Sequence, residues 1–227
     1  HCDPANIIYC EIPTNDTWAR DHSGLTVLDN GQPVLLDFQF NGWGLKFPAN
    51  LDNQITRQLY DQQVFSPIVG YESRKNFVLE GGSLESDGEG TLLTTEACLL
   101  SHNRNEHLTK EQIEEYLQVA LGARCILWLK NGYLAGDDTD SHIDTLARFC
   151  NLQTSTYVQC TDSDDEQYEA LFRMEDELKQ FRTSEGKPYR LIPLPMADAM
   201  YDKDGNRLPA TYANFLIMNE VVLLPFY

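Results

Sequence analysis

The densest group of chemically reactive side chains is the run Gly136-Asp137-Asp138-Thr139-Asp140-Ser141-His142-Ile143-Asp144, which holds four aspartates and one histidine. A calcium loop would need a central glycine and a terminal glutamate, which this spacing lacks. A transition-metal site would need a histidine partner at ligand spacing, and the five histidines form no H-x-H or H-E-x-x-H pair. The third reading is metal-free acid–base catalysis, with His142 oriented by nearby carboxylates and Asp144 directed at a cation. A solvated acidic loop is the alternative without chemistry.

Two further clusters could contribute to a site for a cation. Asp16-Thr17-Trp18-Ala19-Arg20-Asp21-His22 places charged residues beside a tryptophan, whose ring face suits a flat cation. Leu79-Glu80-Gly81-Gly82-Ser83 places one acid before two glycines, which permit close backbone approach. The first cluster is also compatible with a salt-bridged strand start, and the second with a tight surface turn.

Strand-like and helix-like segments alternate along the chain, which predicts an α/β fold. Hairpins are predicted where strand-like runs 24–29 and 34–40 flank Asn30-Gly31, and where runs 83–86 and 91–95 flank Asp87-Gly88. Helical patterns and a capping box at Thr109 predict helices over 50–60, 109–121 and 164–182. Further strands are expected at 6–12, 125–129 (a buried one), 189–194, 211–217 and 221–224.

A loose repeat connects these elements to the reactive clusters. Four segments share one form, a polar cluster followed by two strand-like runs around a turn, and they begin near Trp18, Glu80, His142 and Tyr212. The residues that open them are unusual for strand starts: Asp21, Glu80, His142 with Asp144, and Asn214. If the repeats pack around an axis, these residues converge on one central site. A plain α/β domain with incidental polar strand ends is the alternative.

The composition restricts the partners. The 227 residues include 17 Lys plus Arg and 35 Asp plus Glu, a formal net charge of −18. This excess repels phosphate backbones and anionic membranes, and it favours a cationic partner. No apolar run approaches the roughly 18 residues of a membrane span. The six cysteines show no C-x-x-C spacing, so we expect buried, reduced thiols of a cytoplasmic protein.

The motifs, taken in order, closely resemble the agmatine deiminase family, also called the Porphyromonas-type peptidyl-arginine deiminase family. They cover essentially the whole chain: the three clusters above, with the last extending to Phe149, and also the segments 40–46, 87–91, 103–105 and 209–215. The resemblance implies a five-bladed α/β propeller, the pentein fold. Residues 1–227 would form a single domain that covers its middle blades and is incomplete at both ends.

The resemblance also implies roles for the clustered residues. Asp21 and Asp144 match the carboxylates that hold the two sides of a guanidinium group, and Glu80 matches the acid that orients the histidine and bonds the guanidinium. His142 matches the general acid–base, and Trp18 matches an aromatic wall of the pocket. Three carboxylates suit a planar cation that offers its donors in a fixed fork.

The family's nucleophilic cysteine lies in a Gly-rich stretch near the C-terminus, and none of the six cysteines here has that context. We therefore expect the nucleophile beyond Tyr227, although Cys150 and Cys160 are nearest in sequence to His142. The amine tail of agmatine would be read by an acid, with Asp138 or Asp140 as candidates.

The implied reaction is deimination of agmatine to N-carbamoylputrescine through a covalent thiouronium intermediate, with no metal or organic cofactor. Peptidyl-arginine or free arginine is the alternative substrate. A non-catalytic binder of polyamines or basic peptides and a metal-dependent hydrolase are alternatives from other classes. Open blade edges are prone to association, so a homo-oligomer also stays open.

Overall fold

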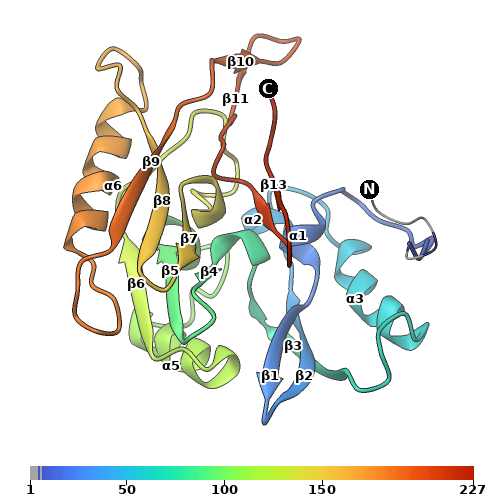
Figure 1. Ribbon diagram of the computed structural model, residues 1–227. Coiled ribbons are helices and arrows are strands. Elements are labelled where there is room, and N and C mark those ends of the chain that lie inside the picture. Colours follow the sequence, from blue (N-terminus) through green and yellow to red (C-terminus); the bar gives the residue numbers. More distant parts are fainter. Residues whose placement is uncertain (1–4, 6) are drawn as a thin grey trace. The chain divides into compact units, whose positions relative to one another are not determined.

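A three-stranded sheet with one or two helices recurs three times along the chain. In each copy an antiparallel hairpin is followed by the helical segment and by a third strand, which pairs parallel to the second. The computed structural model describes residue 5 and residues 7–227, in two compact units that meet in sequence at Gly81 and Gly82. Each unit is shown as a ribbon in Figure 1. The predicted α/β class and the predicted repeat are both confirmed.

The first unit contains one copy of the repeat. Its elements are α1 (Ala19–His22), β1 (Leu25–Asp29), β2 (Gln32–Gln39), α2 (Gly42–Leu45), α3 (Asp52–Asp61) and β3 (Gly70–Val78). The predicted hairpin joins β1 to β2, and Asn30 and Gly31 adopt φ angles of 50° and 80°. Two left-handed residues match the twist of a two-residue hairpin, which explains the Asn-Gly pair.

The second unit contains two copies and two short hairpins. A 3₁₀ turn η2 (Gly81–Ser83) leads into β4 (Glu85–Ser86), β5 (Thr91–Thr95), α4 (Glu96–Leu99), α5 (Lys110–Leu121) and β6 (Cys125–Leu129). A second 3₁₀ turn η3 (Ile143–Thr145) precedes β7 (Ala147–Asn151), β8 (Thr154–Gln159), α6 (Tyr168–Gln180) and β9 (Arg190–Pro195). The hairpins are β10 (Met200–Tyr201) with β11 (Arg207–Leu208), and β12 (Leu216–Ile217) with β13 (Val222–Leu223).

Local signals explain the helix boundaries in the second unit. The Thr109 side chain accepts from the N–H of Gln112 at 3.3 Å, and Gln112 Oε1 accepts from the N–H of Thr109 at 2.8 Å, so the predicted capping box is present. Gly122 ends α5 with a φ of 68°. Helix α6 packs along the sheet β7–β8–β9 (Figure 1) and buries Leu171, Met174 and Leu178 in the core.

Four sequence predictions differ from the structure. Residue 6 lies outside the described residues, and 7–12 form no strand. The helix expected over 164–182 begins at Tyr168, and the strand expected over 211–217 is reduced to β12, because a turn occupies 212–213. Strand β6 is present but is not buried as expected, because Cys125 is exposed, residues 126–128 are half-buried and only Leu129 is buried. Among the described residues no helix has the length and apolar character needed to cross a membrane.

Candidate active site

Asp21 lies in α1, a single helical turn directly before β1, and is 8% exposed. Its N–H donates to the carbonyl of Trp18 at 2.9 Å. Its Oδ2 accepts from Nε1 of Trp43 at 3.1 Å. Trp18 is 58% exposed, so its ring is accessible from solvent beside the buried carboxylate. The turn therefore pairs one buried acid with one accessible aromatic ring.

A second buried acid fixes the segment that leads into this turn. Asp52, at the start of α3, accepts from the hydroxyl of Thr14 at 2.6 Å and from the N–H groups of Asn15 and Asp16 at 2.7 and 3.3 Å. Asn15 returns the contact, since its Oδ1 accepts from the N–H of Leu51 at 2.8 Å. These bonds tie the residues before Trp18 to α3.

Glu80 follows β3 and is completely buried. The next residue, Gly81, lies against the backbone of α1, because a Cβ built on Gly81 would be 2.1 Å from the carbonyl oxygen of Arg20. Arg20 directly precedes Asp21. The first unit thus brings the Glu80 segment and the Asp21 turn into contact, and the glycine that follows Glu80 is the residue that permits it.

This contact predicts the effect of a small substitution. Gly81→Ala is expected to destabilise the protein by about 1–3 kcal/mol, because the added methyl meets a backbone oxygen that cannot rotate away. Gly70→Ala is the matched control, since its Cβ would meet Val34 at 3.4 Å, an ordinary contact. Chemical denaturation of the two variants provides the measurement, and equal midpoints would contradict the close approach.

His22 ends α1 and is 5% exposed, with its ring packed 5.9 Å from that of Phe40. Burial lowers the pKa of His22 below 6.5, although the carboxylates of Asp52 and Asp16 oppose the shift and Lys75 adds to it. The folded protein therefore binds this proton less readily than the unfolded chain does.

A pH dependence of stability follows from that difference. As the pH falls below 6.5, the unfolded chain takes up a proton on His22 that the folded protein resists, so the free energy of unfolding decreases. One such group contributes at most about 1.4 kcal/mol per pH unit. His22→Phe keeps a ring in place and is expected to flatten the decline between pH 6.5 and 5. Denaturation curves across that range test this, and identical slopes in both proteins would refute it.

In the second unit, His142 and Asp144 lie on one turn and are 2% and 3% exposed. The His142 carbonyl accepts from the hydroxyl of Thr145 at 2.8 Å and from its N–H at 3.3 Å. On one side Thr95, at the end of β5, donates to the carbonyl of Ser141 at 2.8 Å. On the other side Thr211 donates to the carbonyl of Thr145 at 2.9 Å. Three threonine hydroxyls therefore hold the turn that carries both candidate residues.

The four aspartates of the acidic run have different surroundings. Asp137 accepts from the N–H of Thr139 at 3.1 Å and from the N–H of Ser141 at 2.7 Å, so it shapes the loop. Asp140 forms an ion pair of 2.6 Å with the fully buried side chain of Arg104. Asp138 is exposed. Asp138 and Asp140 were the two acids expected to bind the amine of agmatine. Of these, Asp140 anchors the loop through its ion pair, whereas the side chain of Asp138 is exposed.

The three candidate acids occupy corresponding places in the repeat. Asp21 lies in α1 before β1, Glu80 lies directly before η2 and β4, and Asp144 lies in η3 before β7. Each therefore precedes the hairpin of one sheet, as the repeat predicted. The fourth position, Asn214, is exposed and precedes β12.

The sequence analysis assigned no role to Arg148 and Glu85, which form a buried ion pair beside the fourth repeated segment, the one that begins near Tyr212. Arg148 Nε lies 2.7 Å from Glu85 Oε2, and both side chains are under 10% exposed. Arg148 also donates to the carbonyls of Ala213 and Phe215, at 3.1 and 2.6 Å, and lies over the Phe215 ring. The two carbonyls flank Asn214. The local signal was an arginine between the apolar residues Ala147 and Phe149, and its contacts with the two carbonyls span 65 and 67 positions.

The cysteines correct one prediction. Cys98 and Cys160 are buried as expected, but Cys125 and Cys150 are exposed, and Cys10 is intermediate. All five are free thiols, and Cys2 lies outside the described residues. Partial desolvation raises the pKa values of Cys125, Cys150 and Cys160. A raised pKa reduces the thiolate fraction, which disfavours these three residues as nucleophiles.

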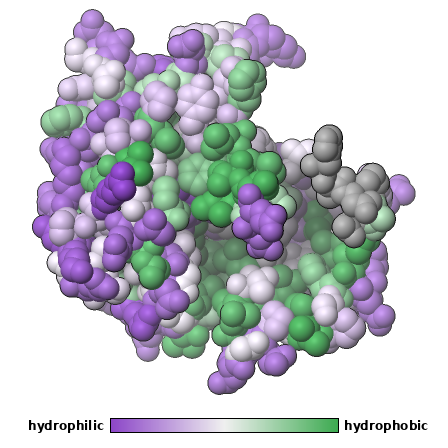
Figure 2. Space-filling model, viewed as in Figure 1, coloured by the Kyte–Doolittle hydropathy of each residue, from purple (hydrophilic) through white to green (hydrophobic). Residues whose placement is uncertain are grey.

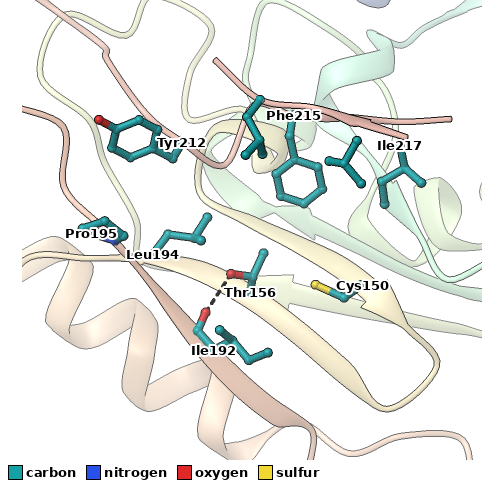
Figure 3. A pocket seen from close by; sticks show the side chains of 10 residues that line it. Cys150, Thr156, Ile192, Leu194, Pro195, Tyr212, Phe215 and Ile217 are labelled. Carbon is teal, nitrogen blue, oxygen red and sulfur yellow. Dashed lines mark hydrogen bonds between the residues drawn. The ribbon is translucent and has the colours of Figure 1, made fainter. Parts of the chain in front are cut away.

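An apolar cavity of about 560 Å³ lies elsewhere in the second unit. Figure 3 shows Cys150, Thr156, Ile192 and Leu194 on the sheet side, facing Tyr212, Phe215 and Ile217 of the C-terminal segment. None of the candidate acids lines it. The adjoining residues of that segment are apolar and exposed, and Figure 2 shows them as a hydrophobic area around β13: Leu216, Ile217, Val222, Leu223 and Leu224. Such a surface is typical of segments that pack against further protein.

Comparison with known proteins finds relatives that are named or described as deiminases. A Porphyromonas gingivalis structure provisionally described as an arginine deiminase is 56% identical with a TM-score of 0.94, over 96% of this chain and 64% of that one. A substrate-bound agmatine deiminase of C. jejuni is 42% identical with a TM-score of 0.89, over 99% of this chain and 64% of that one. A Vibrio parahaemolyticus protein provisionally named agmatine deiminase is 40% identical, over 95% of this chain and 64% of its own length.

The chain thus spans 64% of the length of these relatives. A family model described as Porphyromonas-type peptidyl-arginine deiminase matches residues 2–227, which is nearly every residue. By this match the chain belongs to the Porphyromonas-type peptidyl-arginine deiminase family.

Proposed function

We propose that the protein hydrolyses a C–N bond of a guanidino compound, with agmatine as substrate and N-carbamoylputrescine and ammonia as products, a step in putrescine biosynthesis. The observation that carries this proposal is a buried acid before each of three successive hairpins: Asp21, Glu80 and Asp144. Carboxylates in a buried, low-dielectric environment form strong charge-assisted hydrogen bonds with a cation that reaches them. Membership of a deiminase family supports a guanidinium as that cation.

Each residue then has a defined role. Asp21 and Asp144 accept from the two sides of the guanidinium, and Glu80 accepts from it and orients His142. The ring of Trp18 packs against the substrate. Asp138, which is exposed, is the candidate for the distal ammonium of agmatine.

The proposed reaction proceeds in two balanced steps. A cysteine thiolate, expected beyond Tyr227, attacks the guanidinium carbon and forms a C–S bond. The C–N bond to the leaving nitrogen breaks, and His142 supplies the proton with which ammonia departs. His142 then takes a proton from water, and the resulting hydroxide attacks the thiouronium carbon. The thiolate leaves, and the proton of the added hydroxyl group passes to solvent as the ureido carbonyl forms. The carboxylates stabilise the positive charge throughout, and no metal or organic cofactor is required.

The net charge favours a polycationic substrate. At −18, the chain attracts a dication such as agmatine more strongly than zwitterionic arginine. This attraction should weaken with ionic strength because salt screens it over about 10 Å at 0.1 M.

Free or peptide-bound arginine is the second candidate substrate. The relative that is 56% identical is provisionally described as an arginine deiminase, and the family model names peptidyl-arginine. Discrimination between these substrates depends on the contacts that the pocket makes with the group at the far end of the substrate, which is an ammonium in agmatine and an amino-acid or peptide group in arginine.

One experiment tests both candidates. Full-length protein is incubated with agmatine, arginine and an arginyl peptide, and ammonia and ureido product are quantified. Turnover of agmatine alone supports the first proposal, turnover of arginine or the peptide supports the second, and no turnover supports a non-catalytic binder. Activity abolished by a chelator would support metal-dependent hydrolysis. A haloacetamidine should label one cysteine beyond Tyr227, and labelling of Cys150 or Cys160 would show that the nucleophile lies elsewhere.

We further propose that the three repeated sheets are blades of a single five-bladed propeller domain. The support is their common topology and the corresponding positions of the acids. A cytoplasmic location agrees with the free thiols. The apolar surface at β12 and β13 is compatible with association into a homo-oligomer.

A further inference from the structure

Trp43 directs the polar atom of a buried side chain at a candidate substrate-binding carboxylate. The residue is 4% exposed, and its Nε1 donates to Oδ2 of Asp21 at 3.1 Å. The indole N–H is the single hydrogen-bonding group of a tryptophan side chain, and here it is used on Asp21. A donor to a buried carboxylate acts in a low dielectric, where the bond is stronger than at the surface.

The loop around Trp43 has an unusual backbone that orients the ring. Four consecutive residues, 42–45, have φ angles of 68°, 56°, 81° and 67°. Two of them, Trp43 and Leu45, carry side chains that disfavour this region, so the surrounding contacts must compensate for the strain. Asn41 Oδ1 accepts from the N–H of Gly44 at 2.9 Å, which closes the turn. A Cβ on Gly42 would lie 2.0 Å from the Phe47 carbonyl, so only glycine fits there.

Two aromatic rings pack against the indole, each nearly perpendicular to it. Phe40 lies 4.9 Å from Trp43 at an interplanar angle of 87°, and Phe47 lies 5.6 Å away at 85°. Both are edge-to-face contacts, which favour one ring orientation. The N–H direction is therefore set before any substrate arrives.

We propose that Trp43 is a positioning residue for guanidinium binding, because its N–H fixes the carboxylate plane of Asp21 toward the substrate. This inference rests on the proposed function, in which Asp21 binds the guanidinium. A guanidinium presents its donors in a rigid planar fork, so an acceptor that rotates loses the paired geometry. The arrangement pre-organises the site and lowers the ordering cost of binding and of reaction.

The competing explanation is that Trp43 only fills space. The two explanations differ in what happens when the N–H is removed and the ring is kept. Site-specific replacement Trp43→β-(3-benzothienyl)alanine in the full-length protein puts sulfur in place of N–H on a ring of the same shape. Positioning predicts a fall of about 10- to 100-fold in kcat/KM for agmatine, the effect of one hydrogen bond to a charged group. The melting temperature is expected to fall under either explanation, because a buried hydrogen bond is lost, so kcat/KM of the folded protein is the deciding measurement. Space filling predicts unchanged kcat/KM.

Trp128→β-(3-benzothienyl)alanine is the matched control, because Nε1 of Trp128 also donates to a carboxylate, Glu114 at 2.7 Å, and neither residue belongs to the candidate site. The same exchange of N–H for sulfur is expected there to leave kcat/KM close to that of the unaltered protein. Retained kcat/KM in the Trp43 variant, or a loss in the Trp128 variant as large as in the Trp43 variant, would overturn the positioning role without affecting deimination itself. If the unaltered protein turns over none of the three guanidino substrates, the proposed function fails and this role fails with it.

A spectroscopic readout tests the bond without turnover. In protein labelled with ¹⁵N at the indole nitrogens, the resonance that is lost when Trp43 is replaced by β-(3-benzothienyl)alanine belongs to Trp43. Asp21→Ala removes the acceptor and is expected to move that resonance upfield in the proton dimension. An unchanged resonance in Asp21→Ala would show that the hydrogen bond is not formed, and the inference would be wrong.

Discussion

Replacing Asp144 with asparagine in the full-length protein is expected to lower kcat/KM for agmatine by about a thousandfold or more. The change is nearly isosteric, but it removes the negative charge that opposes the guanidinium. It also places the NH₂ group of asparagine opposite an N–H group of the guanidinium, so that two buried donors face each other without an acceptor. Asp144 is 3% exposed, so little solvent is present to relieve that mismatch.

The variant should fold, because the turn that carries Asp144 is held by other groups. The hydroxyls of Thr95, Thr145 and Thr211 each donate to a carbonyl of residues 141–145. Asp164→Asn is the matched control, since it makes the same change of charge in the same unit on an exposed side chain. Steady-state release of ammonia measures both variants, and near-wild-type turnover in Asp144→Asn would contradict the role assigned to it.

Sequence predicted those elements whose signals are local. The Asn30-Gly31 hairpin and the Thr109 capping box depend on residues a few positions apart, and both are present. The strand expected over 6–12 failed because a strand needs a ladder partner, which its own sequence does not specify. Strand β3 went unpredicted because it is charged: Lys75 is accommodated by Asp37, 2.7 Å away, and that partner is 38 positions distant.

The same limit applies to the candidate site. The acids were found because they recur at the start of repeated strand pairs, which is a pattern visible along the chain. The residues that support them were not found, because their partners are distant in sequence. Trp43 reaches Asp21 across 22 positions, and Arg104 reaches Asp140 across 36. The four aspartates near His142 looked equivalent in the sequence. The structure distinguishes Asp137 and Asp140, whose contacts support the loop, from Asp138, whose side chain is exposed.

His142→Gln is expected to lower kcat for agmatine by about 10²- to 10⁴-fold, the usual contribution of a positioned acid–base group. The amino group is a poor leaving group unless it is protonated and departs as ammonia, so the first step is expected to be slow when the acid is missing. His107→Gln is the control, because His107 is exposed. Turnover of agmatine by His142→Gln at the rate of the control would refute the acid–base role.

An altered leaving group separates the two proton transfers that His142 performs. In the S-methylisothiourea analogue of agmatine, methanethiolate leaves without needing a proton, so His142→Gln should release methanethiol and form the thiouronium on the cysteine. The second step still lacks a base to activate water. The adduct should therefore persist, and intact mass spectrometry should detect it as one N-(4-aminobutyl)amidino group added to the protein. Rapid catalytic turnover of the analogue would mean that another group activates the water. Absence of both thiol release and adduct would mean that His142 is needed for more than protonating the leaving group, for example to activate the thiolate.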